Sequence, residues 1–291
     1  MRDLLSLLLA ALLAACSPAT LLNATVPSGG AEVLSGIAFG PGERDRMDVY
    51  RPASAQGAAP LVVFLYGGSW RAGARGTYPF VALPLAARGA VVAVPDYRLF
   101  PEVGFPDFLR DNARAVAWAM THAAEWGANP RQVVLLGHSA GAYNAAMLAL
   151  DPRWLAEAGA DRGSLAGMVG LAGPYDFLPI TGNTLPVFAA SGAGPSTQPV
   201  SYVDGRNPPL LLLAGEDDAT VRPRNTVSLA ERVRAAGGPV ESRLYPGLGH
   251  IGIVTALAPL FSGRAPVLED VWRFIEALPP APLHAGGGGG L

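Results

Sequence analysis

The chain has 291 residues, of which 50% are apolar and 15% are charged, and its formal net charge is −2. This apolar content suffices for a large buried core and excludes an intrinsically disordered chain, and without a basic excess nucleic acid is not an expected partner. All 21 of its lysine-or-arginine residues are arginines. This excludes Schiff-base, Walker A and Ser-Lys chemistry, because each of these needs a lysine.

The first fifteen residues have the pattern of a signal peptide. Residues 4–15 are apolar or small, and this run is shorter than the stretch of about 20 residues that a membrane-spanning helix needs. It ends at Cys16, the single cysteine, in the sequence LAAC, which resembles a bacterial lipobox. We therefore expect residues 1–15 to be a signal peptide and Cys16 to be lipidated. The lipid would anchor the protein in the bacterial cell envelope, facing the periplasm; plain secretion is the alternative.

Residues 16–44 are rich in Gly, Pro and Ser and are interpreted as the lipidated N-terminus and a linker. The apolar runs that follow are expected strands: Met47–Arg51, Leu61–Tyr66, Ala90–Pro95, Gln132–Gly137, Leu165–Leu171, Leu210–Ala214 and Glu241–Tyr245. Helical patterns lie between and after these runs, near 109–123, 140–150, 222–236 and 267–278. This alternation predicts one α/β domain over residues 45–280, with a doubly wound, mostly parallel sheet and helices on both faces.

Two segments of the expected domain lack periodicity. Residues 173–209 contain several turn formers, and a long irregular segment inside a compact domain is usually functional, so we expect a lid there. Residues 281–291 end in a run of glycines and are expected to be a disordered tail.

A nucleophile motif lies in the middle of the chain. Residues 137–141, GHSAG, form a G-x-S-x-G pentapeptide between an apolar run and an alanine-rich helical pattern. In this strand–turn–helix context the motif presents a serine on a strained turn, where a side chain at either glycine would clash with backbone. Ser139 is therefore the predicted nucleophile.

A serine nucleophile needs a general base, and the chain has four histidines. His138 occupies the variable position of the motif, His122 lies inside an expected helix, and His284 lies in the Gly-rich tail. The remaining one, His250, lies in an expected loop, YPGLGH, directly after an expected strand. It is the predicted base.

The acid that orients such a histidine follows the serine and precedes the histidine in this type of fold. The run PLLLLAGEDDATV ends an expected strand and then presents Glu216, Asp217 and Asp218. This position favours one of these carboxylates as the third member of a catalytic triad.

An oxyanion hole is expected after the strand LVVFL, in the segment YGGSW at 66–70. Its glycines let backbone N–H groups turn towards a substrate oxygen. We assign the donors to Gly68 and Ser69, together with Ala140 from the serine turn.

One rival motif, GLGHIG at 247–252, formally matches the dinucleotide-binding G-x-G-x-x-G. Too few residues follow it to build a nucleotide-binding half, so it is not interpreted as one. No pair of histidines has the spacing of metal ligands, and Cys16 is assigned to the lipid. We expect no cofactor and no metal.

Taken together, these segments resemble the α/β-hydrolase superfamily. The resembling branch contains hormone-sensitive-lipase-like carboxylesterases, kynurenine formamidases and isoprenylcysteine methylesterases, and the likeness covers nearly the whole mature chain. In related hydrolases the strand end reads G-x-x-D-x-x-V, which matches Gly215, Asp218 and Val221. The resemblance therefore implies Asp218 as the acid, with Asp217 as the alternative. The family usually has His where this chain has Tyr66, a departure that affects the oxyanion loop.

The resemblance implies a serine carboxylesterase that hydrolyses a small or medium acyl ester through an acyl-enzyme. One alternative is an arylformamidase-like hydrolase of a small N-formyl amide. Another is a non-catalytic envelope lipoprotein of the same fold that only binds a ligand. The presence of Ser139, Asp218 and His250 favours an enzyme, whereas Tyr66 slightly favours the binding protein.

Overall fold

The computed structural model describes residues 18–52 and 59–281. Its centre is an eight-stranded sheet with the order β1-β2-β4-β3-β5-β6-β7-β8. Strand β2 is antiparallel to both of its neighbours, and all other neighbouring pairs are parallel. The strands are β1 (Ala31–Ala38), β2 (Arg46–Pro52), β3 (Ala59–Leu65), β4 (Val91–Pro95), β5 (Ala128–His138), β6 (Leu165–Leu171), β7 (Leu210–Gly215) and β8 (Val240–Tyr245). The predicted α/β fold with a mostly parallel sheet is confirmed.

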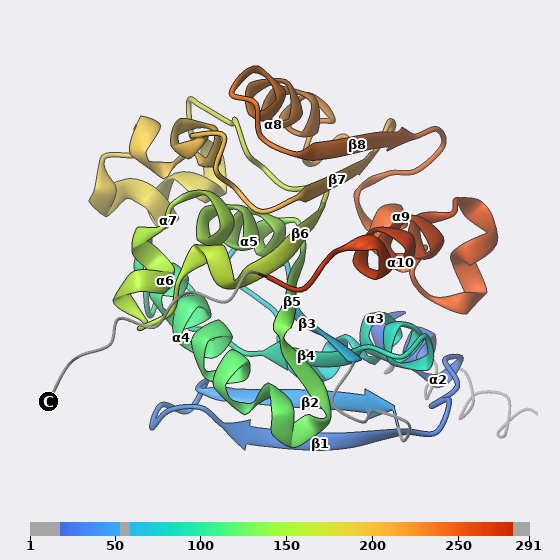
Figure 1. Ribbon diagram of the computed structural model, residues 1–291. Coiled ribbons are helices and arrows are strands. Elements are labelled where there is room, and N and C mark those ends of the chain that lie inside the picture. The colour runs from blue at the N-terminus through green and yellow to red at the C-terminus, as the bar shows by residue number, and fades with distance from the viewer. Residues whose placement is uncertain (1–17, 53–58, 282–291) are drawn as a thin grey trace, which may run out of the picture.

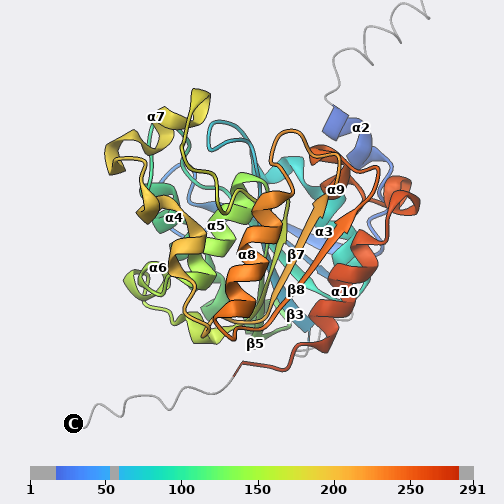
Figure 2. The same ribbon diagram turned by 90° about the horizontal axis from the view of Figure 1, so that it is seen from above.

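Helices cover both faces of this sheet (Figures 1 and 2). One face carries α4 (Asp107–His122), α5 (Ala140–Leu150), α6 (Arg153–Glu157), α7 (Leu185–Phe188) and α8 (Arg224–Ala235). The other face carries α2 (Pro18–Ala24), α3 (Pro79–Ala87), α9 (His250–Thr255) and α10 (Val267–Ala277). The central strands are therefore covered on both sides, which explains why their sequences are apolar without alternation.

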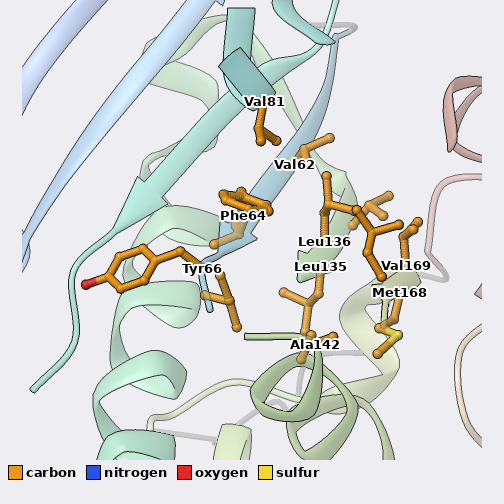
Figure 3. Close-up of a cluster of buried hydrophobic side chains, with 14 of the residues drawn as sticks. Val62, Phe64, Tyr66, Val81, Leu135, Leu136, Ala142, Met168 and Val169 are labelled. Carbon is orange, nitrogen blue, oxygen red and sulfur yellow. The ribbon is translucent and has the colours of Figure 1, made fainter. Parts of the chain in front are cut away.

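The core lies on both sides of strands β3, β5 and β6 (Figure 3). Val62 of β3 is fully buried beneath Val81 of α3, and Leu135 of β5 is fully buried against Ala142 of α5 on the opposite face. Because paired residues of neighbouring parallel strands point to the same face, this packing fixes the register of the sheet. The carboxyl ends of β3, β5 and β7 consequently lie together, and the candidate site forms there.

The structure differs from the sequence prediction over the segment interpreted as a linker. Its described residues contain helix α2 and strand β1, and β1 pairs with β2 along the edge of the sheet. All residues of β1 are exposed or half-buried, without alternating burial. An edge strand of this kind lacks the hydrophobic periodicity by which strands are recognised in a sequence.

Helix α2 is attached to the body of the fold by side-chain contacts. Leu22 is buried in the core. The amide of Asn23 donates to the carbonyl oxygen of Thr77 at 3.1 Å and accepts from the N–H of Phe80 at 2.9 Å. The amide thereby satisfies an N–H in the first turn of α3 that has no partner inside that helix. From Pro18 onwards the segment packs on the domain and does not act as a free tether.

Helix α3 was also not expected from the sequence. Its residues, PFVALPLAA, are apolar on every side, and residues 80–86 are all buried. A helix buried all round shows no amphipathic stripe, and an internal proline such as Pro84 disfavours a helical interpretation of the sequence.

The segment 173–209 folds into short turns of helix around α7 and contains no strand. The signal peptide, Cys16 and residues 282–291 of the tail lie outside the described residues. Within the residues described, no helix is long and apolar enough to cross a membrane.

Candidate active site

The structure brings together the serine, histidine and aspartate singled out in the sequence. Ser139 Oγ lies 2.9 Å from His250 Nε2, and His250 Nδ1 lies 2.8 Å from Asp218 Oδ2. Ser139 and Asp218 lie in the turns after β5 and β7, and His250 begins α9 after β8, so all three meet at the carboxyl edge of the sheet. This hydrogen-bonded chain has the order and geometry of a nucleophile, a base and an orienting acid.

Steric constraints on two glycines determine the position of Ser139. Its backbone has φ 56° and ψ −123°, a left-handed conformation that non-glycine residues rarely adopt. A Cβ atom on Gly141 would lie 1.9 Å from the carbonyl oxygen of Leu65, and one on Gly137 would lie 2.3 Å from that of Gly141. The serine turn therefore packs directly on the backbone after β3, which only glycines allow.

The two neighbouring aspartates after β7 have different surroundings. The side chain of Asp218 is fully buried, and its Oδ1 accepts hydrogen bonds from the N–H groups of Thr220 and Val221 at 2.9 and 2.8 Å. The other oxygen, Oδ2, faces His250. Asp217 is exposed, and its backbone N–H donates to Leu248. Only Asp218 is therefore placed to orient the imidazole.

His250 is the first residue of helix α9, whereas the sequence placed it in a loop. Its carbonyl oxygen lies 3.0 Å from Nε2 of His138, so Nε2 of His138 carries the proton and donates it. Burial of His138, followed by repulsion from His250, lowers the pKa of His138 to about 3. His138 is thus a neutral donor that holds the backbone of His250. Sequence reasoning missed this role because adjacency to Ser139 was its sole signal.

The expected oxyanion loop forms a tight turn after β3. Gly68 is exposed and has φ 129°, and a Cβ there would lie 2.0 Å from the carbonyl oxygen of Ala72. Ser69 and Ala140 line the same pocket as Ser139, a cavity of about 240 Å³. Ala140 begins helix α5, so its N–H has no acceptor within the helix. The turn therefore places two of the three expected donor residues beside the serine, and Gly68 directly precedes Ser69.

Tyr66, which replaces the family's histidine, is fully buried beneath this turn. Its hydroxyl donates to Asp96 Oδ1 at 2.8 Å and accepts from Arg44 Nη2 at 2.9 Å. Burial raises the pKa of Tyr66, so the phenol stays neutral and keeps both bonds. The Tyr97 hydroxyl donates to the carbonyl oxygen of Tyr66 at 2.9 Å. The phenol therefore fits the position and is fully hydrogen-bonded.

The charged groups around Tyr66 extend this network across the loop. Asp96 accepts from the backbone N–H of Arg75 at 2.8 Å and from its guanidinium at 2.5 Å. Arg75 also bonds Asp48 of β2 at 3.0 Å, and Arg44 donates to the carbonyl oxygen of Gly73 at 2.8 Å. Residues 66–75 are thus held at both ends by one network of ion pairs and hydrogen bonds, which we call the brace (Arg44, Asp48, Tyr66, Arg75 and Asp96).

The floor of the pocket is aromatic. Trp70 is buried, its indole N–H donates to Asn144 at 2.9 Å, and its ring packs edge-on against Tyr143 and Phe188. Phe188 belongs to α7 of the segment 173–209, whose Phe177 also lines the pocket. This segment therefore forms one wall of the pocket. Among the described residues, no group of three or more His, Cys, Asp or Glu side chains could hold a metal.

A family model called BD-FAE matches residues 47–233. The chain is 26% identical over 263 residues to the probable isoprenylcysteine alpha-carbonyl methylesterase ICMEL1 of Arabidopsis thaliana, covering 82% of this chain and 55% of that protein. It is 28% identical over 236 residues to esterase LipC of Mycobacterium tuberculosis, covering 74% and 58%. The chain thus spans somewhat more than half the length of these relatives.

A solved structure of esterase B from Lactobacillus rhamnosis has a TM-score of 0.75 at 19% identity and covers 95% of both chains. The Est2 esterase of Thermogutta terrifontis has a TM-score of 0.69 at 23% identity, with 85% of this chain and 92% of that one covered. At these identities the likeness establishes the fold. The resemblance inferred from the motifs is confirmed: the chain belongs to the BD-FAE family and has the α/β-hydrolase fold.

Proposed function

We propose that the protein is a serine carboxylesterase that hydrolyses a small or medium acyl ester through an acyl-enzyme. The observation that carries this proposal is the continuous chain of hydrogen bonds from Ser139 through His250 to the buried carboxylate of Asp218. Relatives named as esterases and methylesterases support the same reaction class.

In the proposed reaction, Nε2 of His250 takes the proton from Ser139 Oγ as this oxygen bonds to the ester carbonyl carbon. The N–H groups of Gly68, Ser69 and Ala140 donate to the oxyanion that forms. His250 then gives its proton to the leaving alkoxide as the ester C–O bond breaks. A water molecule, deprotonated by Nε2 of His250, then bonds to the acyl carbon. The bond between this carbon and Ser139 Oγ breaks, the acid leaves, and His250 returns the proton to Oγ. Asp218 keeps the imidazole in the tautomer with its proton on Nδ1.

Replacement of the nucleophile tests the proposal. Ser139→Ala is expected to lower kcat for p-nitrophenyl acetate by about 10⁶-fold, because losing the nucleophile disables the whole triad. Far-ultraviolet circular dichroism of the variant should match the wild type. Wild-type protein without turnover contradicts the proposal and favours the ligand-binding alternative. A variant within tenfold of wild type contradicts the assignment of Ser139 as the nucleophile.

The arylformamidase-like alternative has one observation in its favour. A kynurenine formamidase from Salmo salar is 31% identical over 152 residues, covering 52% of this chain and 49% of that protein. Parallel assays on N-formylkynurenine and p-nitrophenyl acetate separate the two activities. A larger kcat/KM for the formyl amide than for any ester of an acyl-chain series favours the formamidase.

We also propose that Cys16 carries the lipid of a bacterial lipoprotein and that the enzyme works at a membrane of the cell envelope. The sequence LAAC at the end of a short apolar run supports this. Helix α2 begins at Pro18, two residues after Cys16 in the sequence, and packs on the domain, so few residues separate the proposed lipidation site from the folded part of the chain. We expect this cysteine to carry a diacylglyceryl thioether and an N-acyl chain, and three acyl chains together anchor a protein stably in a membrane.

Mass spectrometry of the N-terminal peptide and detergent phase partitioning test this placement, with Cys16→Ser as the control. We expect the wild type to begin at a lipidated Cys16 and to enter the detergent phase, and the variant to stay in the aqueous phase. An unmodified Cys16 in aqueous wild-type protein indicates simple secretion.

A further inference from the structure

The pocket beside Ser139 carries positive charge and no balancing negative charge. The charged side chains among its lining residues are Arg222 and Arg224, and no Asp or Glu belongs to this set. The remaining lining residues are apolar, aromatic or small and polar: Ser69, Trp70, Ser139, Ala140, Pro174, Phe177, Thr184, Thr220, Val221 and Asn225. A ligand in this pocket would therefore meet two arginine side chains and no carboxylate among the lining residues.

These two guanidiniums are not used by the fold. In the part of the chain that the structure describes, most arginine side chains pair with a carboxylate, as Arg75, Arg98 and Arg162 do, or donate to a carbonyl oxygen, as Arg71 does. Arg222, Arg224, Arg232 and Arg264 are the described arginines whose side chains make no hydrogen bond, ion pair or ring contact. Two of these four line the catalytic pocket.

Helix stability does not explain the two arginines either. Arg224 is the first residue of α8, Arg222 lies two residues before it, and the first turn of this helix contains no acidic residue. Cations are unfavourable at the amino end of a helix, where the helix dipole is positive. An arginine pair placed here adds repulsion that an anionic ligand would relieve.

Hydrogen bonds fix the backbone under the arginines relative to the triad. Asp218, which orients His250, also accepts from the N–H groups of Thr220 and Val221 at 2.9 and 2.8 Å. The amide of Asn225 donates to the carbonyl oxygen of Arg222 at 3.1 Å and accepts from the N–H of Asp176. The segment is therefore rigidly placed beside the serine, while both guanidiniums are exposed and free to turn to a ligand.

We propose that Arg222 and Arg224 bind an anionic oxygen group of the substrate, so that the enzyme prefers esters bearing a carboxylate or a phosphate near the scissile bond. This inference rests on the proposed esterase activity of the same site. Guanidinium is suited to this task, because its planar fork donates two parallel hydrogen bonds to either group. Trp70 and Phe177 provide apolar surface for the part of the substrate between the anion and the ester.

A matched set of acetate esters tests the proposal. 4-Acetoxybenzoate carries the carboxylate, 4-acetoxybenzamide is its neutral counterpart of nearly equal shape, and 4-acetoxyphenyl phosphate carries the phosphate. We expect the wild type to have a kcat/KM at least tenfold higher for one of the anionic esters than for the amide. The two anionic esters distinguish a carboxylate from a phosphate preference. This preference should shrink as salt is raised, because the arginines are solvent-exposed.

Substitutions assign the preference to the two residues. Arg222→Gln and Arg224→Gln should each lower the ratio of anionic to neutral kcat/KM, and the double variant should bring it close to one. Arg222→Lys keeps the charge and should retain most of the ratio. Arg232→Gln is the matched control, because Arg232 lies on the same helix, is exposed and has no partner, but does not line the pocket.

Failure of the inference can be told apart from failure of the proposed function. A wild type that hydrolyses all three esters without preferring an anion overturns the inference, as does a double variant with an unchanged ratio. If no ester is hydrolysed, the esterase proposal fails. Calorimetric titration of Ser139→Ala with the same esters then tests whether the two arginines bind an anionic group. Binding of an anionic ester at least tenfold tighter than the amide supports their role, and equal binding overturns it.

Discussion

The serine turn and the oxyanion loop lie side by side but are held in place by different forces. The serine turn, after β5, is fixed by backbone packing, because Gly137 and Gly141 let it lie directly against neighbouring backbone. The oxyanion loop, after β3, is fixed by the brace, a network of buried and half-buried charges that joins distant segments through Tyr66 and Asp96. Close backbone packing allows only glycine at these two positions. A polar network, in contrast, can accept a different residue if that residue makes equivalent hydrogen bonds. A tyrosine that makes these bonds can therefore occupy the position for which the resemblance implied a histidine.

After Ser139 itself, the acid of the triad is expected to show the largest effect on kcat, and its replacement tests the residues held beside the serine turn. Asp218→Asn should lower kcat by about 10³–10⁴-fold, because the amide favours the wrong imidazole tautomer. Asp217→Asn is the matched control and should cost little, since Asp217 is exposed and does not contact His250. Steady-state kinetics on p-nitrophenyl acetate measure both. The reverse ranking would assign the acid to Asp217.

A methyl group placed on Gly141 should break the serine turn. Gly141→Ala puts a Cβ 1.9 Å from the carbonyl oxygen of Leu65, so backbone must move, and we expect the free energy of unfolding to fall by about 3 kcal/mol or more. Gly263→Ala is the control, because nothing lies within 4 Å of its Cβ position. Urea denaturation of both variants measures the difference. Equal stabilities would show that the turn does not depend on close backbone contact.

The serine turn should also depend on pH through His138. Burial lowers the pKa of His138 to about 3 in the folded protein, whereas an unfolded histidine has a pKa of about 6.5. Below pH 6.5 the unfolded chain binds a proton that the folded protein refuses, so stability is lost as the pH falls from 6.5 towards 3. Between pH 6.5 and 5 the loss should be about 2 kcal/mol.

Urea denaturation of wild type and His138→Gln across this pH range isolates the contribution of His138. The variant, whose amide can still donate to the carbonyl oxygen of His250, should lose less stability on acidification. Parallel profiles for the two proteins would contradict a buried, neutral His138.

Changes at Tyr66 should have the smallest effects on catalysis. They test whether the brace still holds the oxyanion loop when one of its residues is replaced. Tyr66→Phe removes two hydrogen bonds but leaves Asp96 paired with Arg75, so we expect a loss of about 1–3 kcal/mol in stability. Tyr78→Phe is the control. The ring of Tyr78 stacks on that of Tyr66, and the Tyr78 hydroxyl makes no hydrogen bond with any described residue.

Tyr66→His restores the residue of the resembling family. It should keep kcat within about tenfold of wild type, because the proposed oxyanion donors are backbone groups of Gly68 and Ser69. A large gain in activity would mean that tyrosine leaves the oxyanion hole poorly formed, and would favour a non-catalytic role.

Elements with strong local signals could be predicted from the sequence, and those without such signals could not. The apolar runs of β3, β5, β6 and β7 and the amphipathic stripe of α4 were recognised at nearly their observed bounds. Strand β1 was missed because an exposed edge strand needs little hydrophobic periodicity. Helix α3 was missed for the opposite reason, since burial on all sides removes the stripe that marks a helix.

The candidate site divides in the same way. Ser139 is marked by a motif whose glycines are required locally, and His250 follows by elimination among four histidines. The choice between Asp217 and Asp218 rested on a resemblance, because both follow the same strand and differ only in where the turn points their side chains. The role of His138 and the arginine pair at 222 and 224 carried no motif at all.

The sequence by itself determined the α/β architecture, the serine turn and the identity of the residues that reach the carboxyl edge of the sheet. These follow from local rules, namely hydrophobic periodicity, glycine sterics and the order of elements along the chain. Only the tertiary structure decided which aspartate faces His250, that His138 supports it, and that the five residues of the brace form one network. These contacts join side chains far apart in sequence, and their energies depend on burial and on the direction of each side chain, which no local pattern encodes.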